Sequence, residues 1–335
     1  MRTDRWLITI AFSLLIVGGT GWMLNRHWVV PVSDDEHPIH ADELGQEIGE
    51  EAEEVIEEEE IEENTVYSEG YAADDPRRQW LRDSIGQPVW ETVAPGVEIA
   101  RAQGKWKTNI GDSDIWILRA DPAETEFVIH SAKQDGSPRT AQAWCEDKHL
   151  IAAINAGMYQ ADHATNLGFM KLGDFVNQSR ISNDKMFIAF GPRDPALPPA
   201  RMIDTDCHEW EIMIEQYNYV SQSIRMMDCQ MGNRWSRQEK YWSVASAGVD
   251  REGRLLLFHS RSPWAMHDFV DMVLDMGLGL LGMIYLEGGP EASLFIHGSD
   301  STYSRIGSYE TGFFESDDND RFWPIPNVIG VRVRE

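Results

Sequence analysis

Residues 284–296 read Ile-Tyr-Leu-Glu-Gly-Gly-Pro-Glu-Ala-Ser-Leu-Phe-Ile, and this stretch decides how the fold is interpreted. An apolar run ends at Glu287, two glycines interrupt it, and a second apolar run begins at Ala292. The pattern predicts a buried strand, a tight turn and a returning strand. Glycine permits positive φ and a close approach of the backbone, so a ligand could contact the main chain of Gly288 and Gly289 as well as the carboxylates. A hairpin with surface-exposed polar residues is the competing interpretation.

A similar pattern occurs earlier in the chain. Residues 151–159 read Ile-Ala-Ala-Ile-Asn-Ala-Gly-Met-Tyr, an apolar strand that ends at Asn155 before a glycine turn at Gly157. Residues 166–173 are the expected return strand, and a segment with a helical pattern precedes each unit. The sequence therefore predicts two related helix–strand–turn–strand units that bring Asn155 and Glu287 onto neighbouring turns.

Strand-like segments outnumber helical ones, and the two kinds do not alternate strictly. The expected strands lie at residues 97–102, 114–120, 126–131, 185–190, 210–214, 241–249, 254–259 and 328–333. The expected helices lie at residues 140–149 and 264–276, the second with Ser262 as its cap and Pro263 in its first turn. We therefore predict a single α+β domain of mixed β-sheets with flanking helices.

The two turns also carry a family resemblance. Three motifs resemble, in order and spacing, those of the phosphodiester glycosidase domain family: Ala153-Ile-Asn-Ala-Gly-Met-Tyr, Ala247-Gly-Val-Asp-Arg-Glu-Gly and Tyr285-Leu-Glu-Gly-Gly-Pro-Glu-Ala-Ser-Leu. The family includes enzymes that remove N-acetylglucosamine from a sugar phosphodiester, and the resemblance covers residues 97–334. Where the family has Asn-Gly-Gly this chain has Asn-Ala-Gly, and where the family has Asp-Gly-Gly-x-Ser it has Glu-Gly-Gly-Pro-Glu-Ala-Ser. The second difference lengthens the key acid by one methylene and moves the serine.

The implied reaction, cleavage of a sugar 1-phosphodiester, calls for particular side chains. The phosphate charge is matched by the planar fork of arginine, and the oxocarbenium-like anomeric carbon needs a carboxylate as nucleophile or as base for water. Glu287 is the first candidate carboxylate, Glu291 the second and Asp162 the third. Arg225 resembles an arginine of the family and is the first candidate phosphate clamp. Arg261 is the second, because it lies just before an expected helix amino terminus, which favours an anion.

Further substrate contacts are expected at both turns. Asn155 could bond a sugar hydroxyl or hold the neighbouring turn. The other candidate substrate-binding residues are those that the turns present: Gly157, Gly288, Gly289 and Ser293. We predict no cofactor and no metal ligand, with a divalent cation left open, because no spacing resembles a zinc site and residues 317–320 lack the glycine and distal glutamate of an EF-hand. For His163 and His267 a structural role is the simpler interpretation.

The amino-terminal segment differs in character from the rest. Residues 6–24 carry no charge and follow Arg2 and Arg5. This length and charge distribution predict an uncleaved, single-pass membrane anchor with its amino terminus in the cytoplasm, which places the remaining chain in the periplasm or at the cell exterior. A cleaved signal peptide is the alternative.

An acidic stretch follows the apolar one. Of the net charge of −27, sixteen negative charges lie between Asp34 and Glu63, where there is no Lys or Arg, so the remainder carries −11. We divide the chain into residues 1–31 as anchor or signal, 32–75 as an acidic disordered linker, and 76–335 as the phosphodiester glycosidase-like domain. A nucleic-acid partner is not expected, because it would require clustered basic residues.

Three cysteines, Cys145, Cys207 and Cys229, give an odd number. In an exported chain they allow one disulfide and one free thiol. We favour the pair Cys207–Cys229, although the sequence leaves the pairing open, and we expect Cys145 to be a buried thiol on a helix.

These features together predict an exported, membrane-anchored hydrolase that cleaves a glycosyl 1-phosphodiester in a surface or periplasmic glycan. A non-catalytic glycan-binding or scaffold protein on the same fold is one alternative, since a fold does not fix function. A metal-dependent phosphodiesterase that breaks the P–O bond is another.

Overall fold

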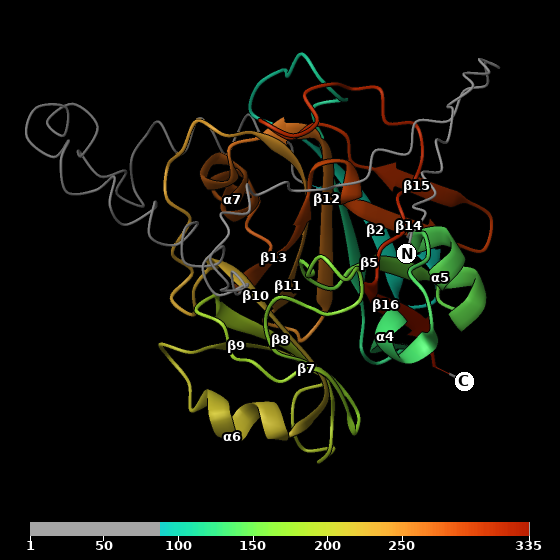
Figure 1. Ribbon diagram of the computed structural model, residues 1–335, viewed down its shortest axis with the longest axis vertical. Helices are drawn as coiled ribbons and strands as arrows, with labels where there is room; N and C mark the ends of the chain where they lie inside the picture. Colours follow the sequence, from blue (N-terminus) through green and yellow to red (C-terminus); the bar gives the residue numbers. More distant parts are fainter. Residues whose placement is uncertain (1–87, 335) are drawn as a thin grey trace, which may run out of the picture. The chain divides into compact units, whose positions relative to one another are not determined.

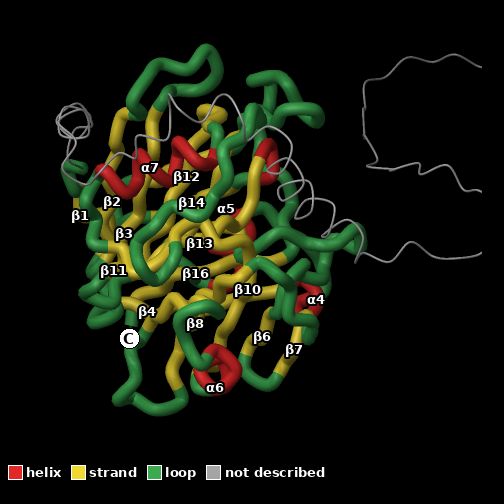
Figure 2. The backbone as a smooth tube through the Cα atoms, turned by 90° about the vertical axis from the view of Figure 1, so that its left-hand side faces the viewer, coloured by secondary structure: helices red, strands yellow, loops and turns green. Residues whose placement is uncertain are grey.

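The computed structural model describes residues 88–334, which are built mainly of β-strands (Figure 1). In these residues sixteen strands form one sheet of eleven strands and one of five. Every pair of neighbouring strands is antiparallel. The prediction of an α+β domain with mixed sheets is therefore wrong: the fold is predominantly β, with two antiparallel sheets and only short helices (Figure 2).

The large sheet runs in the order β1-β2-β3-β12-β11-β13-β10-β6-β7, and β8 pairs with both β10 and β9. The small sheet runs β15-β14-β5-β16-β4. The strands of the large sheet are β1 (Glu91–Ala94), β2 (Val97–Gln103), β3 (Asp114–Ala120), β6 (Met170–Leu172), β7 (Phe175–Gln178), β8 (Lys185–Pro192), β9 (Ala200–Asp204), β10 (Tyr217–Met227), β11 (Trp242–Asp250), β12 (Leu255–Trp264) and β13 (Leu280–Gly288). Those of the small sheet are β4 (Thr125–Ser131), β5 (Ala152–Asn155), β14 (Ser293–His297), β15 (Thr302–Ile306) and β16 (Asn327–Val333). The helices are α4 (Ala132–Asp135), α5 (Ala141–Lys148), α6 (Trp210–Glu215) and α7 (Met266–Asp275), with a 3₁₀ turn η1 (Gly289–Glu291).

Alternation of side chains along the strands sorts the core into layers. On β3, Leu118 packs into the apolar cluster shared by the two sheets, whereas its neighbour Ile117 packs on the other face with residues of α7. This is the expected period of two residues for a strand buried on both faces. Helix α5 covers the outer face of the small sheet, where Trp144 packs against Phe295 of β14. The strands therefore form two central layers: α7 and α6 cover parts of the large sheet, and α5 and α4 pack on the small sheet.

Two helix assignments depart from the sequence predictions. Ser262 and Pro263 belong to β12, and the Ser262 hydroxyl accepts a hydrogen bond from Ser113 N at 2.6 Å instead of capping a helix. Helix α7 begins later, after Ala265, with no side-chain cap, and is held by its apolar stripe on the large sheet. Residues 210–214, predicted as a strand, form α6. Alternating apolar residues in a stretch this short fit a single helical turn equally well.

The two glycine turns carry the chain from one sheet to the other. The first unit passes from β5 in the small sheet to β6 in the large one, and the second from β13 in the large sheet to β14 in the small one. The strand after each turn therefore lies in the other sheet, and the competing interpretation of residues 284–296 as a hairpin is wrong. Strands β5 and β14 pair antiparallel, with Ile154 opposite Leu294, and this pairing brings the two turns next to each other.

The disulfide prediction is confirmed. Cys207 and Cys229 are bonded, and Cys145 is a buried free thiol on α5. The predicted anchor and the acidic linker lie outside the described residues, as do residues 76–87 of the predicted domain. Within residues 88–334, no helix has both the length and the apolar character needed to span a bilayer.

Candidate active site

Glu287 lies at the end of β13, where the chain leaves the large sheet. Glu287 is buried, with 8% exposure, and it pairs with Ala245 of β11. One carboxylate oxygen, Oε1, accepts a hydrogen bond from Gly288 N at 3.0 Å. A buried apolar strand thus ends in a carboxylate, as the sequence pattern predicts, and the structure places it where the chain passes to the small sheet.

Gly288 and Gly289 are required because other side chains occupy the space above their Cα atoms. A Cβ on Gly288 would collide with the Tyr285 hydroxyl and with Trp242. A Cβ on Gly289 would collide with the carboxylate of Glu310, and Gly289 also has φ +61°, which is strained for other residues. The two glycines therefore form a surface, here called the glycine floor, against which the Tyr285 hydroxyl and the Glu310 carboxylate pack.

Tyr285 lies at the centre of a group of carboxylates. Burial raises the pKa of its phenol well above 10, and the nearby charges of Glu287, Glu310 and Glu291 raise this pKa further. The hydroxyl therefore stays protonated at neutral pH and is available as a hydrogen-bond donor. Neither Tyr285 nor Glu310 is among the candidate residues that the sequence predicts. Tyr285 follows the ordinary strand pattern, and Glu310 lies in a loop that no local motif marks.

Two tryptophans, Trp235 and Trp242, pack against Tyr285. The ring centroid of Trp235 lies 5.4 Å from that of Tyr285 and 6.2 Å from that of Trp242. Met158, from the first glycine turn, packs against the same apolar cluster. The two turns therefore contribute to one site, and its aromatic wall could accommodate a sugar face.

Asn155 holds the second turn in place. Its amide Nδ2 donates to Glu291 O at 3.1 Å, and its Oδ1 accepts from Ser293 N at 2.8 Å. The Ser293 hydroxyl also donates to Glu291 O, at 3.0 Å. Of the two roles considered for Asn155, the observed hydrogen bonds are those of a residue that fixes the neighbouring turn. Both side chains are almost fully buried.

Gly157 has φ +142° and lies against Asn166, whose Oδ1 would be 2.8 Å from a Cβ at this position. Asn166 in turn donates to the backbone oxygens of Gly168 and Gln222. Gly157 therefore lets the first turn approach a buried amide. Asp162 accepts hydrogen bonds from Ala164 and Thr165 of its own loop.

Arg225 lies on β10, opposite Ile284 of β13, which is three residues before Glu287. Its Nη1 contacts Asp204 Oδ1 at 2.7 Å and Asp206 Oδ2 at 2.8 Å. Burial opposes the charge of the guanidinium, but the hydrogen bonds to Asp206 and Asp204 prevail and raise its pKa. Its charge is therefore compensated by two aspartates, one of them buried.

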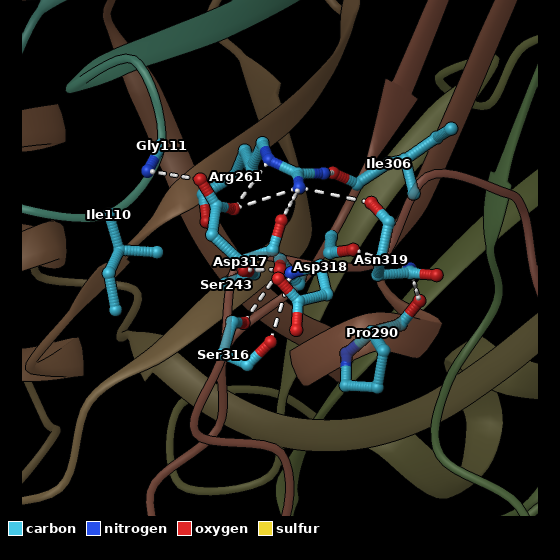
Figure 3. Close-up of polar contacts among 12 residues, drawn as sticks. Ile110, Gly111, Ser243, Arg261, Pro290, Ile306, Ser316, Asp317, Asp318 and Asn319 are labelled. Atoms are coloured by element: carbon cyan, nitrogen blue, oxygen red, sulfur yellow. Dashed lines mark hydrogen bonds and ion pairs between the residues drawn. The ribbon is translucent and has the colours of Figure 1, made fainter.

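Arg261 is engaged with the loop of residues 307–323 (Figure 3). Its guanidinium donates to the backbone oxygens of Ile306, Asp317 and Asn319, and its Nε donates to Asp317 Oδ1 at 2.8 Å. Asn319 then donates to Pro290 O in the second turn, at 3.3 Å. Arg261 therefore joins this loop to the turn, and it lies on β12 instead of at a helix amino terminus.

The two histidines considered in the sequence, His163 and His267, contact neighbouring side chains. His163 packs on Tyr159, and His267 faces Asp268 and Asp271. In residues 88–334 one group of potential metal ligands lies close together, Asp204 with Cys207 and Cys229. Its two sulfurs are bonded to each other and supply no thiolate.

A family model for phosphodiester glycosidases matches residues 148–332, more than half of the 335 residues. The matched residues include both turns, Arg225, Arg261 and Glu310. The comparison with curated proteins returned no match.

Two solved structures share the fold. The catalytic domain of zebrafish N-acetylglucosamine-1-phosphodiester alpha-N-acetylglucosaminidase, auto-inhibited by its pro-peptide, has a TM-score of 0.51 at 13% identity and covers 76% of this chain and 93% of its own. A hypothetical protein from Synechocystis has a TM-score of 0.50 at 12% identity and covers 74% of this chain and 64% of its own. The family match and the placement of both motif turns at one site lead to one conclusion: this chain belongs to the phosphodiester glycosidase family.

Proposed function

We propose that this protein hydrolyses a glycosyl 1-phosphodiester, releasing a free sugar and a phosphomonoester, with its site at the Glu287 turn. The observation that carries the proposal is the buried Glu287 carboxylate on a glycine floor beside a protonated tyrosine, within the residues that the family model matches. A desolvated carboxylate held next to the anomeric carbon stabilises positive charge more strongly than one in water.

In this proposal Glu287 is the carboxylate at the anomeric carbon, and Glu291 is a supporting acid in the same turn. The sugar binds beside the two turns, where Gly157, Gly288 and Gly289 let Asn166, Tyr285 and Glu310 pack directly against the backbone. Asn155 and Ser293 keep the turn in one geometry through the hydrogen bonds described above. Rigid positioning of this kind lowers the entropy cost of reaching the transition state.

The phosphate requires a cation, and Arg225 remains our candidate. Its Nη1 is occupied by Asp204 and Asp206, so binding through Arg225 would use the other edge of the guanidinium fork. Arg261 was the second candidate, but its contacts with the loop support a positioning role instead.

We also propose that the chain is exported and anchored by residues 6–24, with residues 32–75 as a spacer and the folded part acting on a surface or periplasmic glycan. The Cys207–Cys229 disulfide supports export, because disulfides persist mainly in oxidising compartments. A reporter that is active only after export, fused after Glu335, should be active. Activity of a cytoplasm-requiring reporter at the same position would contradict this topology.

Product analysis tests the reaction. The purified full-length chain is incubated with a panel of sugar 1-phosphodiesters that differ in sugar and aglycone, with and without a chelator. We expect free sugar and a phosphomonoester from at least one member of the panel. Sugar 1-phosphate as the product would point to P–O cleavage by a phosphodiesterase. Binding without turnover of any member would support a glycan-binding protein.

A further inference from the structure

We propose that Glu310 is the second carboxylate of the site and acts as the base that takes a proton from the attacking water. This inference deepens the proposed function and rests on it. Glu310 lies 23 residues after Glu287 in the sequence, outside every motif discussed above, and only the fold brings it to the glycine turn.

The Glu310 carboxylate lies against the second glycine turn. Glu310 Oε2 lies directly above the Cα of Gly289, and the Tyr285 hydroxyl lies above the Cα of Gly288. Glu287, Glu310 and Glu291 all lie close enough to Tyr285 for their charges to raise the pKa of its phenol. Glu287 Oε1 also accepts a hydrogen bond from Gly288 N at 3.0 Å. A carboxylate from a distant loop thus meets two polar side chains of β13 at two adjacent glycines.

The fold also fixes the backbone around Glu310. Glu310 forms an isolated bridge with Trp242, and the preceding Tyr309 accepts a hydrogen bond from Ser243 N at 2.9 Å. Ser308 N donates to the Ser243 hydroxyl at 2.9 Å. The loop is therefore attached to the first residues of β11, the strand that pairs with Glu287.

Arg261 and Asn319 complete this attachment on the far side of the loop. Arg261 binds three backbone oxygens and the Asp317 carboxylate, and Asn319 bridges Gly307 O at 2.8 Å and Pro290 O (Figure 3). These hydrogen bonds fix both ends of the loop relative to the turn that carries Glu291. We assign Arg261 as a positioning residue for Glu310, since a carboxylate acts as a base only when it is held within hydrogen-bond reach of the water.

In the proposed step, water displaces the phosphomonoester from the anomeric carbon. The oxygen of a water molecule bonds to the anomeric carbon as the bond from that carbon to the phosphate oxygen breaks. The bonding electron pair stays on the phosphate oxygen, giving a phosphomonoester, and one water proton moves to Glu310, which later releases it to solvent. Glu287 faces the positive charge that develops on the anomeric carbon, and the neutral Tyr285 hydroxyl donates a hydrogen bond within the site.

The test compares two glutamates of one loop in the full-length chain. Glu310→Gln should lower turnover about a hundredfold with an unchanged melting temperature. Glu315→Gln is the matched control: Glu315 is exposed on the same loop, its carboxylate accepts only a local hydrogen bond from Gly312 N at 2.8 Å, and its removal should leave turnover unchanged. Equal effects of the two substitutions would overturn the proposal.

A nucleophile that needs no base provides the second measurement. With Glu310→Ala, added azide should restore turnover and give a glycosyl azide, because azide attacks without losing a proton. The acid limb of the pH profile should also change from a slope of about two in the wild type to about one, since one fewer carboxylate must be ionised. Arg261→Lys should lower turnover while keeping the wild-type slope, as expected for a positioning residue.

Each outcome has a separate meaning. If the wild type releases no sugar from any phosphodiester, the proposed function fails and this inference fails with it. If the wild type is active and Glu310→Gln retains that activity, only the role of Glu310 is overturned. An inactive Glu310→Ala that azide does not restore, with an unchanged pH slope, would likewise exclude Glu310 as the base.

Discussion

The two glycine turns have the same sequence pattern but different functions in the structure. In the first turn, Asn155 places its amide on the backbone of the second turn, and Gly157 packs against a buried asparagine. In the second turn, ionisable groups of β13, of η1 and of the loop that carries Glu310 lie around the two glycines. A polar residue at the end of a buried strand can therefore support a neighbouring turn, as Asn155 does, or act in the site, as we propose for Glu287.

The difference follows from the chemistry of the two side chains. An amide has both a donor and an acceptor, so it can satisfy the N–H and C=O groups of a neighbouring turn without charge. A buried carboxylate keeps a charge that an adjoining backbone can only partly satisfy, and such groups concentrate at functional sites. Substitutions in the first turn should therefore mainly lower stability, and substitutions in the second turn should mainly lower turnover.

The largest expected effect is at Glu287. Glu287→Gln keeps the shape and removes the charge, so turnover should fall about a hundredfold or more while the melting temperature changes little. Steady-state kinetics and thermal unfolding on the same preparations give both quantities. A large loss of stability with modest loss of turnover would reverse the comparison and make Glu287 a structural residue.

Asn155→Ala should show the opposite pattern. It removes the acceptor for Ser293 N and the donor for Glu291 O, both in a buried environment. Unsatisfied buried groups cost about 1–3 kcal/mol, so the free energy of unfolding should fall by that amount in denaturant titrations. Asn183→Ala, at an exposed position, is the control and should be near neutral. Unchanged stability together with weaker substrate binding would instead indicate that Asn155 bonds the sugar.

Arg225 tests whether the site extends onto β10. Arg225→Lys keeps the charge but loses the planar fork, and the loss of one charge-assisted hydrogen bond to phosphate should raise KM about tenfold. Arg234→Lys is the matched control, because Arg234 also pairs with a buried aspartate, Asp228, yet is half exposed and lies in the loop after β10. If both substitutions lower only the melting temperature, Arg225 is part of a structural pair and another cation binds the phosphate.

The smallest expected effect concerns a histidine behind the second turn. His259 is fully buried, and its Nε2 lies 3.1 Å from Ala292 O. Burial lowers its pKa from 6.5 to about 3, with a further lowering by Arg305, so the folded protein holds it neutral while the unfolded chain protonates it below pH 6.5. Stability should therefore be lost as pH falls from 6.5 towards 3, by at most about 1.4 kcal/mol per pH unit.

The His259 contribution is measured as a difference between variants. His259→Gln should flatten that part of the stability profile, whereas His297→Gln, at an exposed position, should leave it unchanged. Identical profiles for the wild type and His259→Gln would show that other groups set the acid sensitivity.

Local sequence signals predicted much of the strand content and both turns. The boundaries of β3 match the prediction, those of β2, β4, β8 and β16 differ by only a few residues, and Thr140 caps α5 through a hydrogen bond from Ala143 N. These features depend on side-chain alternation and capping, which are properties of short segments. The eleven-residue β10 and the loop of Glu310 were missed, because their polar residues, such as Ser221 and Gln222, are buried through partners far away in the chain.

The sequence alone determined the two glycine turns, the candidate acid Glu287 and the family resemblance, because each is carried by residue type and spacing, whereas it favoured the Cys207–Cys229 pair without fixing it. Only the tertiary structure decided that the sheets are antiparallel and that each turn crosses between them. It also decided that Asn155 supports its neighbour, that Arg261 holds a loop and that Glu310 meets Gly289. These outcomes depend on which distant segments pair, and strand pairing is set by the burial of whole faces across the chain, which no single stretch encodes.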